Sequence, residues 1–363
     1  MAVTKHAFSQ DGKVDEYVLS NSVGTKVYLT TWGARLTRFI VKDSEDKPRD
    51  IVAGFETYEK WQESLDIDDP YFGATIGRVA GRIQPCDKVE IGGSQCQLTE
   101  NQPNKVCLHG GKHGFDKKIF QAHVHEQSDV SSITFTYVSA DGEEGFPGEI
   151  ELSITYSLDN DNGLHLDYAG KLISGTESVL NPTNHTYWNL TGFEEPTVHN
   201  HTCQLLATYY MDTCVDKPMV PNGELLPVHG TKLDFASAPR RVGDELETFD
   251  KDKERGYDHV FVHNDQQTAT DAVVREVARV ESACSGLRLT VLSDQPAIVL
   301  YTGNWISNEL VGKYGVRYGN YAALALETQK LANAVNIPWF RNEVLLTPDR
   351  PFTHRTIFRI DHI

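Results

Sequence analysis

Basic residues are scarce in this sequence. Its 363 residues include 34 lysines and arginines against 51 aspartates and glutamates, which gives a net charge of −17. Nucleic acids and anionic membranes bind proteins through positively charged surfaces, so we expect neither of them as a partner. The same deficit disfavours a polyanionic substrate. A neutral small molecule is the ligand that this composition favours.

The sequence also lacks long apolar runs. No stretch reaches the roughly 18 apolar residues that a membrane-spanning helix needs. The first residues, MAVTKHAFSQDG, contain no apolar segment of the kind found in a secretory signal peptide. These two absences predict a cytoplasmic protein.

Motifs for metals and cofactors are missing as well. The cysteines form no Cys-x-x-Cys pair and show no cysteine–histidine spacing typical of zinc sites. No GxGxxG follows a predicted strand, and there is no P-loop. We therefore expect no metal, no cofactor and six free thiols. These thiols are Cys86, Cys96, Cys107, Cys203, Cys214 and Cys284.

What the sequence does contain is alternation of apolar and polar residues with a period of two, the pattern of half-buried β-strands. Only two stretches have the pattern of short amphipathic helices, and no linker divides the chain. The sequence therefore predicts one all-β domain over residues 1–363, a large antiparallel β-sandwich with few short helices. The predicted strand segments are 26–41, 149–158, 163–173 and 286–304, and the predicted helices are 56–64 and 241–249.

Two polar residues lie in unusual surroundings. His185 belongs to NPTNHTYWNL, where amides, hydroxyls and two aromatic residues surround it. Glu327 interrupts the apolar run AALALETQ. A carboxylate on such a strand is costly to bury, and burial raises its pKa toward the range that a general base needs. The alternatives are an ordinary loop for the histidine and a strand edge for the glutamate.

Three further segments combine glycine with polar residues. Arg82 lies in FGATIGRVAGRI and is a candidate for ligand binding. The alternative is that this segment is a bulged strand with surface arginines. His109 precedes two glycines in CLHGGKHG, where a surface turn is the alternative. Asp258 begins a strand in RGYDHVFV and either caps a turn or accepts hydroxyl protons from a polyol. His259, next to it, is a second possible ligand residue or simply part of the strand.

Taken in order, these segments resemble the aldose 1-epimerase (galactose mutarotase) family. The resemblance rests on WGARL, FGATIGRVAGRI, LHGGKHGFDK, NPTNHTYWNL, GYDHVF, SDQPAIVLYTGN and LETQKLANAVN, and it covers most of the chain. It implies the galactose mutarotase-like β-sandwich (supersandwich) and an isomerase that interconverts the α and β anomers of free aldohexoses such as galactose and glucose. It also implies that no metal or cofactor takes part.

The resemblance implies roles for individual residues. Glu327 would take the proton of the anomeric hydroxyl, and His185 would protonate the ring oxygen from the opposite side of the sugar. An ionised Glu327 nearby would favour the charged imidazolium of His185. The residues that would bind the sugar are Arg82, His109, His185, Asp258, Gln295 and Glu327. Tyr187 and Trp188 are candidates for the wall of the pocket.

One position departs from the family pattern, and other functions stay open. Gly81 stands where the family commonly has asparagine, which removes a probable sugar contact. A sugar-binding or sensor protein without catalysis is the main alternative. A glycosidase would need two carboxylates, for which Asp258 and Glu327 are available, but His185 would then have no role. A sugar-phosphate epimerase would need a basic cluster, which is absent.

Overall fold

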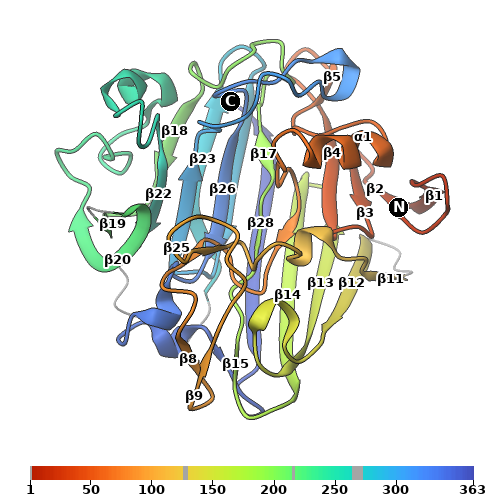
Figure 1. The fold of residues 1–363 in the computed structure, drawn as a ribbon. Helices are drawn as coiled ribbons and strands as arrows, with labels where there is room; N and C mark the ends of the chain where they lie inside the picture. Colours follow the sequence, from red (N-terminus) through yellow and green to blue (C-terminus); the bar gives the residue numbers. More distant parts are fainter. Residues whose placement is uncertain (1, 126–129, 215–216, 264–272) are drawn as a thin grey trace.

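The computed structural model describes residues 2–125, 130–214, 217–263 and 273–363. These residues form an antiparallel β-sandwich built mainly from three sheets of nine, six and five strands (Figure 1). All pairs of neighbouring strands in these sheets are antiparallel. The predicted fold class is therefore confirmed.

The nine-stranded sheet runs, in spatial order, β11 (Gln121–His125), β12 (Ser131–Ser139), β13 (Glu149–Leu158), β14 (Gly163–Ser174), β28 (Phe352–His362), β24 (Leu287–Ser293), β23 (Arg275–Ser282), β18 (Thr202–Leu205) and β21 (Arg240–Arg241). The six-stranded sheet runs β17 (Tyr187–Trp188), β26 (Leu324–Gln329), β25 (Ala297–Tyr301), β22 (Asp258–Val262), β19 (Tyr209–Cys214) and β20 (Lys217–Pro227). The five-stranded sheet runs β1 (Ala2–Ala7), β2 (Asp15–Ser20), β3 (Lys26–Thr30), β4 (Arg35–Lys42) and β5 (Pro48–Asp50).

Short strand pairs and turns complete the described structure. The two-stranded pairs are β7 (Arg82–Ile83) with β10 (Cys107–Leu108), β6 (Thr75–Ile76) with β16 (Thr183–Asn184), β8 (Val89–Ile91) with β9 (Ser94–Cys96), and β15 (Ser178–Val179) with β27 (Leu345–Leu346). The one α-helix in the described ranges is α1 (Tyr58–Leu65). The 3-10 helices are Phe115–Lys117, Glu143–Gly145, Val242–Thr248, Lys313–Gly315, Ala334–Asn336 and Arg341–Glu343.

The predicted segments match these elements closely. The segment 149–158 is β13, in which buried and half-buried residues alternate along the whole strand. Segment 26–41 becomes β3 and β4, separated by a turn in which Gly33 has φ +70°. Segment 56–64 corresponds to α1, whose N-terminus is capped by the Thr57 side chain. The stretch predicted to be helical at 241–249 is also a helix, of the 3-10 type, over Val242–Thr248.

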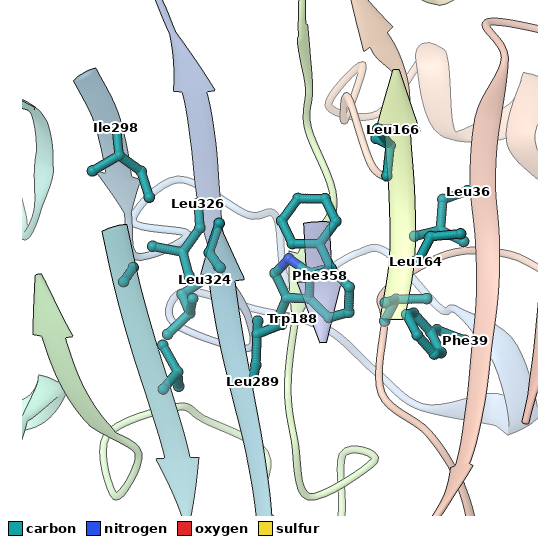
Figure 2. Close-up of a cluster of buried hydrophobic side chains, with 14 of the residues drawn as sticks. Leu36, Phe39, Leu164, Leu166, Trp188, Leu289, Ile298, Leu324, Leu326 and Phe358 are labelled. Carbon is teal, nitrogen blue, oxygen red and sulfur yellow. The ribbon is translucent and has the colours of Figure 1, made fainter. Parts of the chain in front are cut away.

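The core lies where the three sheets pack together (Figure 2). Leu324 and Leu326 of β26 point into it, together with Trp188 of β17. Because side chains of a strand alternate between its two faces, Glu327 and Gln329 lie on the opposite face from these leucines. The pattern ALALETQ therefore anchors β26 in the core and presents its polar residues to the other side of the sheet. Side chains from the other sheets in this cluster include Leu36, Phe39, Leu164, Leu166, Leu289 and Phe358.

Candidate active site

A cavity of about 480 Å³ lies on the face of the six-stranded sheet that carries Glu327. Its floor comes from β22, β25 and β26, and its opposite wall comes from β7 and the loops that precede it and follow β10. Five of the six sugar-binding residues predicted from the sequence line this one cavity. They are Arg82, His109, His185, Asp258 and Glu327.

Glu327 lies in the middle of β26, paired with Val299 of β25. Only 3% of its surface is exposed. The pKa of its carboxyl is raised from 4.5 to about 8, chiefly by burial and to a smaller extent by the negative charge of Asp258, while the positive charge of Arg82 opposes the shift. The raised pKa agrees with the expectation that burial brings this carboxyl toward the range of a general base.

His185 lies between β16 and β17, where backbone hydrogen bonds hold it on both sides. Its N–H donates to the carbonyl of Ala74, and its carbonyl accepts from the N–H of Gly73. The imidazole stacks on Tyr187 at 4.9 Å and on Tyr71 at 5.9 Å between ring centres. Its Nε2 lies 3.4 Å from Oε1 of Glu327. The ring is therefore fixed in direction, with one nitrogen toward the carboxyl group.

The two groups are neighbours and do not face each other across the cavity, which corrects the expected placement on opposite sides of the sugar. The structure also corrects the expected charge of His185. Burial is the largest effect on the imidazole and lowers its pKa to about 3, so these surroundings do not favour the imidazolium. Burial also raises the pKa of Glu327, so the fold favours the neutral form of both groups.

His109 has a defined tautomer. The N–H of Gly81 donates to its Nδ1 at 3.2 Å, so Nδ1 is unprotonated and Nε2 carries the hydrogen. Burial and the neighbouring His185 lower the pKa of His109 well below its usual value, and the ring stays neutral. The backbone N–H of His109 also donates to the backbone carbonyl of Gly81, so two hydrogen bonds join these residues. His109 is thus set up to donate one hydrogen bond to a ligand oxygen.

Arg82 and Asp258 form the charged side of the cavity. Nη1 of Arg82 lies 3.5 Å from Oδ2 of Asp258, and its Nε donates to Oε1 of Gln102 at 3.3 Å. Both charged side chains keep about a fifth of their surface exposed (21% and 18%). Their free donors and acceptors can therefore bind hydroxyl groups of a ligand while each side chain is still held in place by the other.

Two residues considered in the sequence lie elsewhere, as does Arg78, the first arginine of FGATIGRVAGRI. Gln295 is in the turn between β24 and β25, outside the cavity lining, and its Nε2 donates to Asp294. His259 points away from the cavity and contacts Tyr210 and Phe249. Arg78 is buried instead of lying on the surface, and it donates to the carbonyls of residues 139, 140 and 147.

The two aromatic residues after His185 have separate roles. Tyr187 lines the cavity, whereas Trp188 is fully buried in the core against Phe358. Sequence reasoning missed Tyr71 and Gln329, which also line the cavity. Tyr71 directly precedes the quoted FGATIGRVAGRI motif, and Gln329 follows Glu327 on the same face of β26. Strand periodicity was the signal that could have identified Gln329.

The described ranges contain no cluster of three histidine, cysteine or acidic side chains able to hold a metal ion. None of their helices is long and apolar enough to cross a membrane. All six cysteines are free thiols, as predicted.

Comparisons with known proteins agree with this geometry. Residues 15–359 match the family model of aldose 1-epimerase. The chain is 35% identical to galactose mutarotase from Homo sapiens, over 99% of this chain and 98% of that protein. It is 33% identical to aldose 1-epimerase from Haemophilus influenzae, over 89% and 88% of the two chains. Among solved structures it resembles an aldose epimerase homologue from C. elegans, with a TM-score of 0.82, 25% identity and coverage of 95% and 98%.

Proposed function

This chain belongs to the aldose 1-epimerase family, and we propose that it exchanges the anomers of neutral aldohexoses such as galactose and glucose by general acid–base catalysis. It is thus an isomerase of carbohydrate metabolism. We assign Glu327 as the base at the anomeric oxygen O1 and His185 as the acid at the ring oxygen O5. The observation that carries this assignment is the 3.4 Å separation of these two buried groups in one cavity.

The short separation suits the reaction because O1 and O5 are bonded to the same carbon, C1. Glu327 accepts the O1 proton while His185 donates a proton to O5, the C1–O5 bond breaks, and C1 becomes an aldehyde. After rotation about C1–C2, O5 adds to the other face of the carbonyl and both protons return. Each proton transfer of this kind contributes roughly 10²–10⁴-fold to a rate.

The proton balance of the pair fits this sequence of steps. The pair carries one proton throughout, and binding of the sugar moves it from Glu327 to His185. Hydroxyl groups that donate to the Glu327 carboxylate stabilise its charged form and so favour that transfer. Ring opening then returns a proton to Glu327 and leaves His185 neutral. When the sugar is in its open-chain form, Glu327 is therefore protonated and His185 is neutral. These are the uncharged forms that burial favours.

The other cavity residues position the sugar. We propose that Nε2–H of His109 donates to an oxygen of the ring and that Asp258 accepts from hydroxyl groups. Arg82 donates to a further oxygen and its charge opposes the rise in the pKa of Glu327. These directional groups surround a neutral ligand, and the described cavity lining contains no cluster of basic side chains for a phosphate. The six free cysteines are consistent with the cytoplasm as the site of action.

Polarimetry tests the proposal. Freshly dissolved α-galactose should reach anomeric equilibrium much faster with the protein than in buffer, and His185→Asn should lower that acceleration by at least about 100-fold. His201→Asn is the matched control, because His201 is equally buried, its pKa is lowered to about 4, and it lies outside the cavity. We expect this control to lose stability and keep its turnover.

The alternatives give different results in the same experiment. Binding of galactose without any acceleration would support a sugar-binding protein and refute catalysis by the pair. Release of sugar from an aryl galactoside would support a hydrolase. Equal turnover of wild type and His185→Asn, with both folded, would refute the role of His185.

A further inference from the structure

Gln329 is a buried polar side chain with no partner for its amide. It has no exposed surface, yet it lines the cavity. Within the described residues neither its Nε2 nor its Oε1 makes a hydrogen bond. Leaving both ends of a buried amide unpaired is costly, and native proteins rarely do so. The amide of Gln329 therefore needs a partner that the described chain does not supply.

The space beside this amide is open because residue 81 is a glycine. A Cβ atom at Gly81 would lie 3.9 Å from Nε2 of Gln329 and 3.0 Å from Cβ of Ala332. Ala297 of β25 pairs with Gln329, and Val262 of β22 pairs with Ala297, and neither side chain offers a hydrogen-bonding group. The strand neighbours of the amide are thus apolar, and the cavity that Gln329 lines is the side from which a polar partner can reach it.

The spacing along β26 fits one occupant. Glu327 and Gln329 lie on the same face of the strand, and residues so related are roughly 7 Å apart. A pyranose whose O1 meets Glu327 therefore has a hydroxyl on another ring carbon within reach of Gln329. An amide suits a hydroxyl group because it offers both a donor and an acceptor, and a hydroxyl group does the same.

We propose that Gln329 is a substrate-binding residue that pairs with one hydroxyl of the aldose and selects sugars that carry it. This inference rests on the proposed anomer exchange at the same site. The amide contributes no proton to the reaction. It orients the ring so that O1 and O5 face Glu327 and His185, and a sugar without the hydroxyl leaves the amide unpaired.

The test compares galactose with its monodeoxy analogues in wild type and in Gln329→Leu, using anomer-specific NMR exchange or polarimetry. In wild type, one analogue should lose about 10-fold or more in kcat/KM relative to galactose. In Gln329→Leu, kcat/KM for galactose should fall by a similar factor. The penalty, defined as the loss of kcat/KM for an analogue relative to galactose, should then disappear for that one analogue. The penalties for the other analogues should stay unchanged.

Controls separate this role from a structural one. Gln62→Leu removes a glutamine on α1 that also has an unpaired Nε2 but lies outside the cavity, and it should leave every penalty unchanged. If the leucine variant fails to fold, Gln329→Asn replaces it, since the shorter amide cannot reach the same hydroxyl. A Gln329 variant that changes only the unfolding midpoint and keeps all penalties would overturn the proposal. Absence of anomer exchange in wild type would instead refute the proposed function.

Discussion

Replacement of Glu327 by glutamine should abolish turnover and at the same time stabilise the protein near neutral pH. Glutamine has nearly the same shape as a protonated glutamate, so the packing of β26 is retained. It cannot accept the O1 proton, so we expect turnover to fall by roughly 10²–10⁴-fold. The gain in stability follows from burial, because the wild-type fold holds a carboxyl group that the unfolded chain would ionise.

The size of this gain follows from the pKa of Glu327, which burial raises from 4.5 to about 8. The folded protein therefore keeps a proton that the unfolded chain releases, and the wild type loses stability as the pH rises from 4.5 to about 8. A pH of 7 lies about 2.5 units above the pKa of 4.5 of the unfolded carboxyl, and each unit corresponds to about 1.36 kcal/mol. The expected penalty is thus about 3 kcal/mol at pH 7, and less than about 1 kcal/mol at pH 5.

Urea unfolding of wild type and Glu327→Gln between pH 5 and pH 8 measures the effect directly. The difference in the free energy of unfolding should grow with pH in favour of the variant. Glu63→Gln, which removes an exposed carboxylate from α1, controls for the general loss of one negative charge. A difference that stays constant from pH 5 to pH 8 would refute the reasoning, because it would mean that Glu327 is ionised in the fold.

Three further expectations follow from the site. The catalytic pair works only while it carries its single proton, so kcat/KM should fall on the alkaline side near pH 8, and a flat profile to pH 10 would contradict the raised pKa of Glu327. Gly81→Asn should lower the free energy of unfolding by about 1 kcal/mol, because φ is +77° and the new Cβ meets Ala332 at 3.0 Å. Ala332→Gly should recover part of that loss in a double-mutant cycle, and strict additivity would show that the contact is unimportant. Gln295→Leu should lower stability by roughly 1 kcal/mol through its lost bond to Asp294, with KM for galactose within about two-fold of wild type, whereas a ten-fold rise would place Gln295 at the sugar.

Much of the fold followed from local patterns. Alternation in residues 149–158 predicted β13, and the break at Gly33 marked the turn between β3 and β4. The helical pattern at 241–249 gave a 3-10 helix, so the pattern located a helix there and did not distinguish its type. The alternation in AALALETQ predicted that Glu327 lies on a strand with apolar neighbours. It did not predict the contact of Glu327 with the imidazole of His185.

The candidate site was predicted unevenly. The order of the polar segments indicated Arg82, His109, Asp258, His185 and Glu327, all of which line one cavity. The same reasoning indicated Gln295, which is not part of the cavity lining and donates to Asp294. Residue type and position in a motif were alike in these cases, so the sequence could not separate Gln295 from the other five.

The sequence by itself determined that β26 turns Leu324 and Leu326 to one side and Glu327 to the other, because strand periodicity is a property of the local chain. Only the tertiary structure decided that His185, far away in the sequence, lies 3.4 Å from that carboxyl. It also raised the pKa of Glu327 and lowered that of His185, since pKa values depend on burial and on neighbouring charges. Contacts between distant segments and the exclusion of water exist only once the sheets have packed.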